Sequence, residues 1–420
     1  METERQNPEG SSFFARQTLC AFRSRNFRTY FAAQLASSIG TWMQITVENW
    51  LVLQISQSGM AIAVTNLLQF SPSVLIGMYG GVIADRHDRR RILMVTQGSL
   101  GLLALVVGLL AAFGTVRVWI IWIAAGGFGF IKCFDLPALQ AFTKDLVGEE
   151  DLSNAVAWTG VIAALGRTIG PALGGLLLTT MGVAPGFLFN AVTFSIIVMV
   201  LASLRRDELA QRAFAPRMQH QVRAGLTYVC AAPTLAATSV VMLAVFISSY
   251  NFQVSIALIA STVLHGDSRI YGWLMSALGL GAASGSLMFA RWQRVGLLMV
   301  IILAIALAAT QVGLAAMHSL TLLAAGTFAY GMCVGLFSAT VVSTLQLFAS
   351  DDMRGRVMAL YSTCFLGSAL IGVPGFAALA EGLGVSSALR AAALICVGGA
   401  VASAIIWRPH LQSPLRHPIS

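Results

Sequence analysis

Residues 81–91 read GVIADRHDRRR and lie between two long apolar runs, at about 60–84 and 92–113. An apolar run of about 18 or more residues is long enough to cross a membrane as a helix. The stretch between two such runs must therefore reverse the chain at a membrane surface. Arginine and lysine in short loops remain on the cytoplasmic side, so the sequence predicts that this turn faces the cytoplasm.

The composition extends this interpretation to the whole chain. Of 420 residues, 57% are hydrophobic and 10% are charged, whereas a soluble domain carries about 25% charged residues. The apolar runs are about 20 residues long and lack the two-residue alternation of membrane strands. We therefore expect an all-α membrane protein. The net charge of +9 gathers in the joins between the runs, so it predicts topology and no nucleic-acid partner.

The six cysteines are scattered along the chain, at positions 20, 133, 230, 333, 364 and 396. None forms a C-x-x-C pair and most lie in apolar runs, so we expect small buried hydrophobes, with no disulfide framework and no metal site. No cofactor is expected. The first 26 residues are polar and basic without the apolar core of a signal peptide, so the first membrane helix is expected to direct insertion.

Twelve membrane helices are expected, in two six-helix halves. They lie at about 28–53, 60–84, 92–113, 117–141, 155–179, 184–204, 235–263, 270–290, 295–316, 319–345, 357–380 and 386–407. With the N-terminus inside, 21 of the 26 basic residues fall on the cytoplasmic side and 3 outside, which favours this count and orientation. The predicted parts are a cytoplasmic segment 1–27, a half 28–204, a cytoplasmic linker 205–234, a half 235–407 and a cytoplasmic tail 408–420.

The pattern G-x-x-x-D-R-x-x-R-R in residues 81–90 resembles the loop between the second and third helices of the major facilitator superfamily. Its members are Gly81, Asp85, Arg86, Arg89 and Arg90. Asp85 is hypothesised to latch the second helix to the start of the eleventh, near Arg354 and Arg356, in one of two transport states. Arg86 is expected to pair toward Asp135. The alternative is a basic turn that only sets topology.

The fifth span contains GRTIGPALGG at residues 166–175. Gly166, Gly170 and Gly174 recur every four residues, so they form one bare stripe on a helix, which another helix can approach closely. Pro171 permits a bend there. The eighth span offers a partner stripe in Ala277, Gly281 and Gly285. We therefore expect these two spans to nearly touch at Gly170.

The full string G-x-x-x-G-P-x-x-G-G resembles the fifth-helix motif of antiporters in the same superfamily. The motif residues here are Gly166, Arg167, Gly170, Pro171, Gly174 and Gly175. The resemblance implies export against a proton gradient, whereas ordinary glycine-mediated packing is the plainer alternative.

Most of the chain resembles one branch of that superfamily, the transmembrane secretion effectors. The resemblance is carried by residues 26–28, 40–44, 50–53, 134–138, 154–155 and 354–358. It implies efflux of a small amphipathic molecule or siderophore across a bacterial inner membrane by a monomer. Two departures are Asp88, where many relatives have glycine, and Glu48, where relatives often have an uncharged amide.

Charged residues inside the predicted spans are Glu48, Lys132, Asp135 and Arg167. Each costs roughly 2.5–3.5 kcal/mol if unpaired. Lys132 and Asp135 are three apart on one helix, so they can face each other. The pair either neutralises itself or forms part of a relay that faces the central cavity.

Glu48 and Asp135 are the candidates for a proton carrier. Glu48 has no basic residue one helical turn away, and burial opposes its ionised form. The competing interpretation is an outer-rim glutamate that is solvated or hydrogen-bonded to Asn49 or Gln44. Asp135 has basic neighbours, which favour its ionised form and make it the weaker proton acceptor.

In the fold that the resemblance implies, the first, fourth, seventh and tenth helices line a central cavity. The candidate substrate contacts are Trp42, Gln44, Glu48, Asn49, Lys132, Tyr250, Asn251, Gln253, Tyr330 and Phe337. Mid-span amides must find partners, and aromatic walls with few charges suit an amphipathic substrate. Aromatic side chains in spans are more often packing than ligand contacts.

The leading function is a proton-coupled secondary exporter, with a small-molecule substrate, protons and the lipid bilayer as partners. No G-x-x-x-x-G-K-[ST] phosphate loop is present, which disfavours a primary pump, and no H-E-x-x-H motif supports an enzyme. The alternatives are a transporter-like sensor that does not transport, or a polytopic membrane enzyme.

Overall fold

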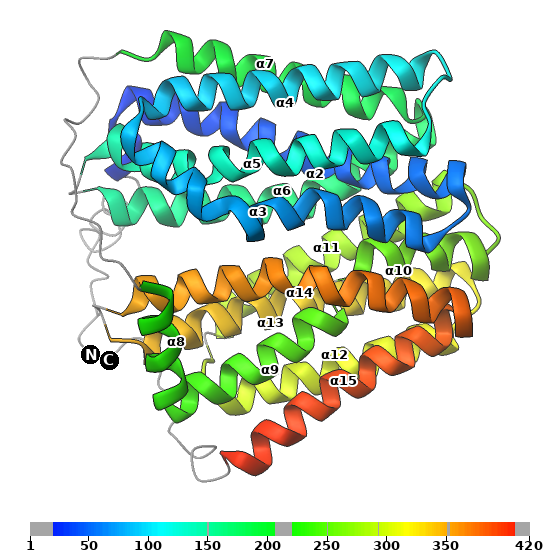
Figure 1. Ribbon diagram of the computed structural model, residues 1–420. Coiled ribbons are helices and arrows are strands. Elements are labelled where there is room, and N and C mark those ends of the chain that lie inside the picture. The colour runs from blue at the N-terminus through cyan, green and yellow to red at the C-terminus, as the bar shows by residue number, and fades with distance from the viewer. Residues whose placement is uncertain are drawn as a thin grey trace, which may run out of the picture.

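The computed structural model describes residues 20–148, 151–205, 221–249, 251–292, 294–350 and 353–407. Within these ranges all regular elements are helices (Figure 1). They are η1 (Cys20–Arg23), α2 (Arg25–Ser56), α3 (Gly59–Arg86), α4 (Arg89–Ala112), α5 (Val118–Val147), α6 (Leu152–Thr180), α7 (Ala184–Ser203), α8 (Gln221–Ala231), α9 (Pro233–Ser249), α10 (Phe252–Leu258), the π-helical η2 (Ile259–Val263), α11 (Ser268–Trp292), α12 (Leu297–Ala316), α13 (Leu320–Phe348), α14 (Arg354–Leu383) and α15 (Val385–Ile406).

The described helices agree with the predicted all-α membrane fold. Eleven segments are long and apolar enough to cross a membrane, with α9, α10 and η2 counted as one. The remaining predicted span, the first at about 28–53, is α2, which is 32 residues long. Its Gln34, Gln44, Glu48 and Asn49 make it less apolar, but it packs against α3, α5, α6 and α7 inside the bundle.

The crossing helices form two groups, α2–α7 and α9–α15, which lie side by side (Figure 1). We call them the N-terminal and C-terminal halves. The main contacts between them join α3 to α14 and α6 to α11. Helix α8 falls within the predicted linker 205–234 and was not foreseen; it packs against α9 and α14. Residues 206–220 of that linker lie outside the described residues.

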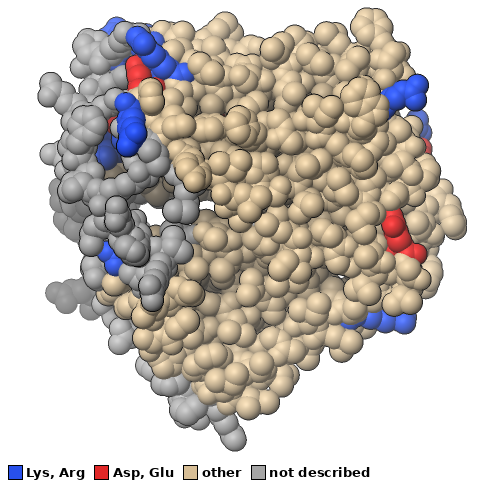
Figure 2. Space-filling model, in the orientation of Figure 1, with Lys and Arg blue, Asp and Glu red and all other residues tan. Residues whose placement is uncertain are grey.

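The two ends of the bundle differ in their turns. The α3–α4, α5–α6 and α13–α14 turns share one end with α8 (Figure 1), and we call it the basic end because Arg89, Arg90 and Arg91 lie there. The α2–α3 and α14–α15 turns lie at the opposite end. On the face seen in Figure 2, Lys, Arg, Asp and Glu side chains gather toward the two ends, and the surface between them is uncharged. An uncharged belt of this kind suits contact with lipid.

The glycine stripe of α6 packs within the N-terminal half. A Cβ atom on Gly170 would lie 2.5 Å from the Cβ atom of Trp42 and 2.8 Å from the carbonyl oxygen of Ile39, and one on Gly174 would lie 2.9 Å from the carbonyl oxygen of Met43. A Cβ atom on Gly166 would clash with Ser38, also on α2. The prediction that Gly170 meets the eighth span is therefore wrong, because this face of α6 is turned toward α2.

A different face of α6 meets α11. A Cβ atom on Gly175 would lie 2.5 Å from the Cα atom of Gly272, and the Ser276 hydroxyl donates to the carbonyl oxygen of Ala172 at 3.4 Å. A Cβ atom on Gly279 would clash with the backbone of Thr168. Positions 168, 172 and 175 therefore share one helical face, as do 272, 276 and 279.

The proposed partner stripe on the eighth span also has another neighbour. Cβ atoms on Gly281 and Gly285 would clash with the carbonyl oxygens of Phe328 and Met332 on α13. These glycines bring α11 close to α13 within the C-terminal half. The prediction that they pair with the stripe of α6 is wrong, because positions 281 and 285 lie on the side of α11 that is turned away from α6.

Candidate functional site

Glu48 lies inside the N-terminal half, where it is 4% exposed. Its Oε1 atom accepts a hydrogen bond of 2.9 Å from Nε2 of Gln69 on α3. Burial contradicts the solvated part of the alternative interpretation, whereas the contact with Gln44 that it also named is present. The amide partner Gln69 was not foreseen. Gln69 lies on α3, the span that follows α2 in the chain. A search for amide side chains on the neighbouring span would therefore have identified it as a candidate partner.

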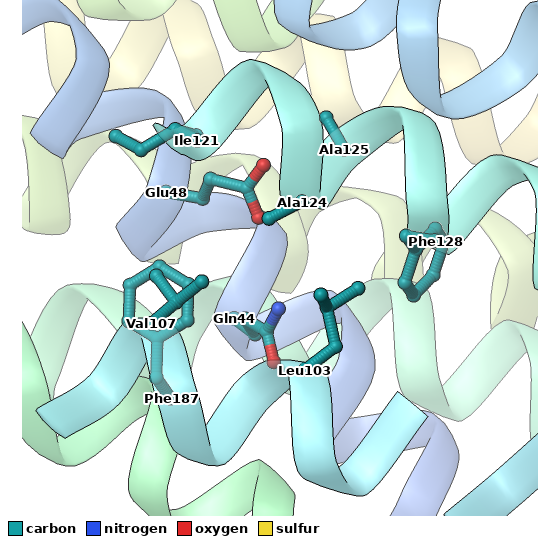
Figure 3. Close-up of a pocket in the computed structure, with 9 residues that line it drawn as sticks. All are labelled: Gln44, Glu48, Leu103, Val107, Ile121, Ala124, Ala125, Phe128 and Phe187. Atoms are coloured by element: carbon teal, nitrogen blue, oxygen red, sulfur yellow. The ribbon is translucent and has the colours of Figure 1, made fainter. Parts of the chain in front are cut away.

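Glu48 borders a small cavity of about 10 Å³, roughly the size that holds one water molecule. Figure 3 shows its carboxyl group beside side chains of α5, with α4 and α7 on the other side of the cavity. The other lining residues are Gln44, Leu103, Val107, Ile121, Ala124, Ala125, Phe128 and Phe187. An ionised carboxylate in such apolar surroundings is costly, so the geometry suits a group that holds a proton.

Further buried amides extend from Glu48 to neighbouring helices. Nδ2 of Asn190 on α7 donates to Oε1 of Gln44 at 2.8 Å, and Nδ2 of Asn66 on α3 donates to Oδ1 of Asn49 at 3.0 Å. Hydrogen bonds thus connect α2 to α7 through Gln44 and to α3 through Glu48 and Asn49. The structure places Gln44 and Asn49 within the half, at 9% and 2% exposure.

Asp135 is fully buried on α5 and accepts three hydrogen bonds. Its Oδ1 atom accepts from Thr96 and Gln97, each at 2.8 Å, and its Oδ2 atom lies 2.7 Å from Nζ of Lys132. The expected pairing of Lys132 with Asp135 is confirmed. The expected pairing of Arg86 with Asp135 is wrong, because α4 and α5 already satisfy this carboxylate and Arg86 is exposed.

One face of α5 joins the two acidic sites. Ile121, Ala125 and Phe128 line the cavity at Glu48, and Lys132 and Asp135 continue the same helical face. Nζ of Lys132 lies 5.7 Å from the centre of the Phe128 ring. The cavity and the ion pair are therefore neighbours along the inner face of a single helix.

The arginines of the 81–90 motif hold the basic end of the N-terminal half together. Arg89 forms a 2.6 Å ion pair with Asp145 of α5, and Arg90 donates to the carbonyl oxygens of Leu201 and Ala202 at the end of α7. Asp88, the departure from the usual glycine, accepts from the backbone N–H of Arg90 at 3.0 Å as the N-cap of α4.

The described residues include only part of the proposed latch. Gly81 lies within α3, and the side chain of Asp85 lies outside the described residues. Nε of Arg354 donates to the carbonyl oxygen of Gln346, and Arg356 contacts the sulfur of Met353, both within the C-terminal half. The latch from Asp85 to the eleventh span therefore stays a prediction.

The seventh span is broken between α9 and α10, near the predicted Tyr250 and Asn251. The Tyr330 hydroxyl donates to the carbonyl oxygen of Ser249, and Nε2 of Gln311 donates to that of Ser248 at 3.3 Å. A break in a membrane helix needs such partners because lipid offers none. Nδ2 of Asn251 donates to the carbonyl oxygen of Gly372 at 3.4 Å, and Tyr250 lies outside the described residues.

Most other cavity candidates are also buried. Gln253 is 7% exposed, Tyr330 4% and Phe337 0%. Tyr330 and Phe337 belong to α13, and Gln253 belongs to α10, which contacts both halves. Trp42 differs, because it is half-buried and contacts Arg167.

Arg167 lies at the middle of α6 and is exposed. Its guanidinium carbon is 5.9 Å from the ring centre of Trp42 on α2 and 5.7 Å from that of Phe365 on α14. Because α2 and α14 belong to different halves, Arg167 stands between them. Arg167 was predicted as part of the glycine motif and as one of the charges inside the spans, whereas Phe365 was not among the candidate residues.

The halves are joined toward the opposite end of the bundle. Oε1 of Glu381 on α14 accepts from the Ser58 hydroxyl at 2.6 Å and from the backbone N–H of Met60 at 2.9 Å. Trp50 stacks on Tyr271 of α11, with ring centres 5.1 Å apart. Glu381 thus caps the first turn of α3 from across the interface, so the described structure is closed at this end.

Comparison with known proteins identifies the family. The model of the family described as transmembrane secretion effector matches residues 16–416. The chain belongs to this family of the major facilitator superfamily. The protein is therefore a multi-pass membrane transporter, and its family is one of transporters and not of enzymes.

Three relatives illustrate the range of the family. The enterobactin exporter of Shigella flexneri is 31% identical over 319 residues, 73% of this chain and 72% of that protein. The staphyloferrin A transporter of Staphylococcus aureus is 21% identical over 79% of this chain and 84% of its own. An uncharacterised transporter of the superfamily from Bacillus subtilis is 24% identical over 89% and 90%.

Solved structures share the fold of this family member. A bacterial homologue of the human lysosomal transporter Spinster, in an inward-facing and unoccupied conformation, superposes with a TM-score of 0.69 at 14% identity, over 94% of this chain and 99% of that one. The nucleoside transporter NupG superposes with a TM-score of 0.65 at 11% identity, over 93% and 100%. At these identities the likeness concerns the fold alone.

Proposed function

We propose that the protein exports a small amphipathic molecule, such as a siderophore or a drug-like compound, in exchange for protons and by alternating access. The proposal places it in a bacterial inner membrane with the basic end, the linker and both termini in the cytoplasm. Two relatives named for enterobactin export and staphyloferrin A transport support a small-molecule substrate.

The observation that carries the proton part of the proposal is the setting of Glu48. It is a buried carboxyl beside an apolar cavity, and the side chains that hydrogen-bond to it are the neutral amides of Gln69 and Gln44. Asp135, by contrast, has the ammonium group of Lys132 at 2.7 Å. A neighbouring cation stabilises the ionised carboxylate, so Glu48 is the better proton carrier and Asp135 the more permanent charge.

In this proposal α2 transmits the protonation of Glu48 to the interface between the halves. Glu48 is held to α3 on one side of α2, and Trp50, two positions later, projects from the other side and stacks on Tyr271. Loss or gain of the proton changes the hydrogen bond between Glu48 and Gln69, and with it the position of α2 relative to α3. The stacking of Trp50 then changes with it, which biases the equilibrium between the two transport states.

Transport in proteoliposomes tests the proposal. The full chain is reconstituted with a pH-sensitive dye inside the vesicles, and enterobactin is added outside under an imposed pH gradient. We expect protons and substrate to move in opposite directions, and an ionophore that collapses the gradient to stop accumulation. Protein-free vesicles are the control. Accumulation that persists after the gradient is collapsed contradicts proton coupling.

A further inference from the structure

Arg167 is a cation at mid-membrane that retains hydrogen-bonding capacity. A guanidinium has five N–H donors, and Nε of Arg167 donates to the carbonyl oxygen of Ala163 at 3.4 Å. Among the described residues, no carboxylate lies within ion-pair distance of it. An uncompensated charge at this depth is costly unless it faces water or a ligand.

The setting of Arg167 contrasts with the other charges predicted inside the spans. Lys132 and Asp135 neutralise each other, and Glu48 is enclosed at 4% exposure. Arg167 is exposed, and its position between α2 and α14 places that exposure at the interface of the halves. It is therefore accessible to a molecule that enters between them.

Aromatic rings flank this cation from both halves. Trp42 approaches from α2 and Phe365 from α14, at 5.9 and 5.7 Å from the guanidinium carbon to the ring centres. Phe365 is held in place by an edge-on contact of 5.3 Å with Phe246, which also contacts Tyr361 at 5.6 Å. The N–H groups of this guanidinium that are not hydrogen-bonded can bind a planar anion, which Arg recognises through two parallel hydrogen bonds.

We propose that Arg167, Trp42 and Phe365 form a binding site for an aromatic acid, whose negative group pairs with Arg167 while its ring packs on Trp42 and Phe365. This inference rests on the proposed function, because it names the substrate class of the exporter. The site spans both halves, so a bound acid contacts both at once. Rocking of the halves then changes its contacts, as alternating access requires.

A pair of fluorescent probes that differ in charge tests this site. 8-Anilinonaphthalene-1-sulfonate carries the rings of N-phenyl-1-naphthylamine plus one sulfonate group. Binding of each is titrated on the full chain in phosphatidylcholine nanodiscs, and the signal of empty discs is subtracted. The unmodified protein should prefer the sulfonate probe. Arg167→Gln should lower the affinity for the sulfonate probe by at least about ten-fold, since a lost hydrogen bond to a charged group is worth that much. The affinity for the neutral probe should stay unchanged.

Two further variants separate the charge from the rings. Arg167→Lys keeps the charge and should retain a preference for the sulfonate probe. Phe365→Leu should lower the affinity for both probes by a similar factor. Size-exclusion profiles check that each variant is folded. Equal affinities of the unmodified protein for the two probes, or an equal loss of both in Arg167→Gln, overturn the site.

The binding titration is independent of flux, which separates this inference from the proposed function. Sulfonate binding through Arg167 in a protein that moves no protons would refute the exporter alone. Proton-driven export by a protein that ignores the sulfonate group would refute the aromatic-acid site alone.

Discussion

The two halves share a helical scaffold and differ in what their interiors contain. Among the described residues, the buried charged side chains are Glu48, Arg90 and Asp135, and all three belong to the N-terminal half. The buried polar side chains of the C-terminal half are uncharged, with Gln311 and Ser248 as examples. Among the described residues, the buried carboxyl groups therefore lie in one half.

Equivalent helices make the contrast sharper. In the N-terminal half, the sixth and first segments are joined by an amide pair, Asn190 and Gln44, at 2.8 Å. In the C-terminal half, the twelfth and seventh segments are joined by the thiol of Cys396 and the hydroxyl of Ser248, at 2.9 Å. The C-terminal half instead has a broken seventh span. The buried carboxyl groups thus lie in one half and the interrupted span in the other.

Removing the proposed proton carrier from the N-terminal half should have the largest effect. We expect Glu48→Gln to reduce proton-driven export to the level of protein-free vesicles, because an amide cannot take up the proton, while substrate exchange without a gradient continues. The matched control is Gln311→Met in the C-terminal core, which should lower the yield of folded protein and keep the ratio of protons to substrate. Normal proton-driven export in Glu48→Gln would move the role to Asp135 or another group.

Two glycines of α6 separate packing within a half from packing between halves. Gly175→Leu should block the close approach to Gly272 and impair transport, because overpacking typically costs about 1–3 kcal/mol and here it falls on the closed state. Gly170→Leu crowds Trp42 and Met43 within the N-terminal half, so it should lower the apparent melting temperature in detergent more than Gly175→Leu does. The reverse order of melting temperatures would mean that the two faces are exchanged.

These glycines also show which features of the fold could not be predicted from the sequence. The twelve spans could be predicted because membrane crossing depends on local length and composition. The stripe at Gly166, Gly170 and Gly174 was found from its spacing, but spacing does not say which helix covers it. The face at 168, 172 and 175 was overlooked because only its last member is a glycine.

The candidate site was predicted in part for a similar reason. Lys132 and Asp135 could be paired because they lie one turn apart on a single helix. Gln69 could be found as an amide on the neighbouring span, but its pairing with Glu48 could not be predicted, because the two lie on different helices. Phe365 could not be placed, because it reaches Arg167 from the other half. The role of Asp88 was recognisable in principle, because aspartate directly before a helix is a strong N-cap signal, although the resemblance presented it as a departure from glycine.

The closure at the opposite end should respond to Glu381. Glu381→Gln removes the negative charge from the first turn of α3, and such a contact is worth about 1 kcal/mol, or about a five-fold shift toward the open state. The rate at which a water-soluble thiol reagent labels Leu258→Cys, buried beside Gly59, should rise accordingly in a background without native cysteines. Arg390→Gln, exposed at the same end, is the control and should leave the rate unchanged.

The smallest effect concerns the turns at the basic end, where the halves again differ. Asp88 caps α4 through its side chain, whereas the N-cap residue of the equivalent α12 is Gly296, which has no side chain to cap the helix and a φ of 129°. The carboxylate of Asp88 also lies 3.6 Å from Nε of Arg91, but both side chains are largely exposed, at 48% and 72%, and exposed pairs contribute little.

The stability of Asp88 variants therefore distinguishes the cap from the ion pair. Asn caps helices about as well as Asp, Gly costs only a few tenths of a kcal/mol, and Ala costs about 1 kcal/mol. We expect the apparent melting temperature to stay unchanged in Asp88→Asn, to fall slightly in Asp88→Gly and to fall most in Asp88→Ala. If Asp88→Asn lowered the melting temperature as much as Asp88→Ala, the negative charge of Asp88 would be the stabilising feature. The α3–α4 turn would then depend on its ion pair with Arg91, and the contrast with the glycine-started α12 would lose its basis in capping.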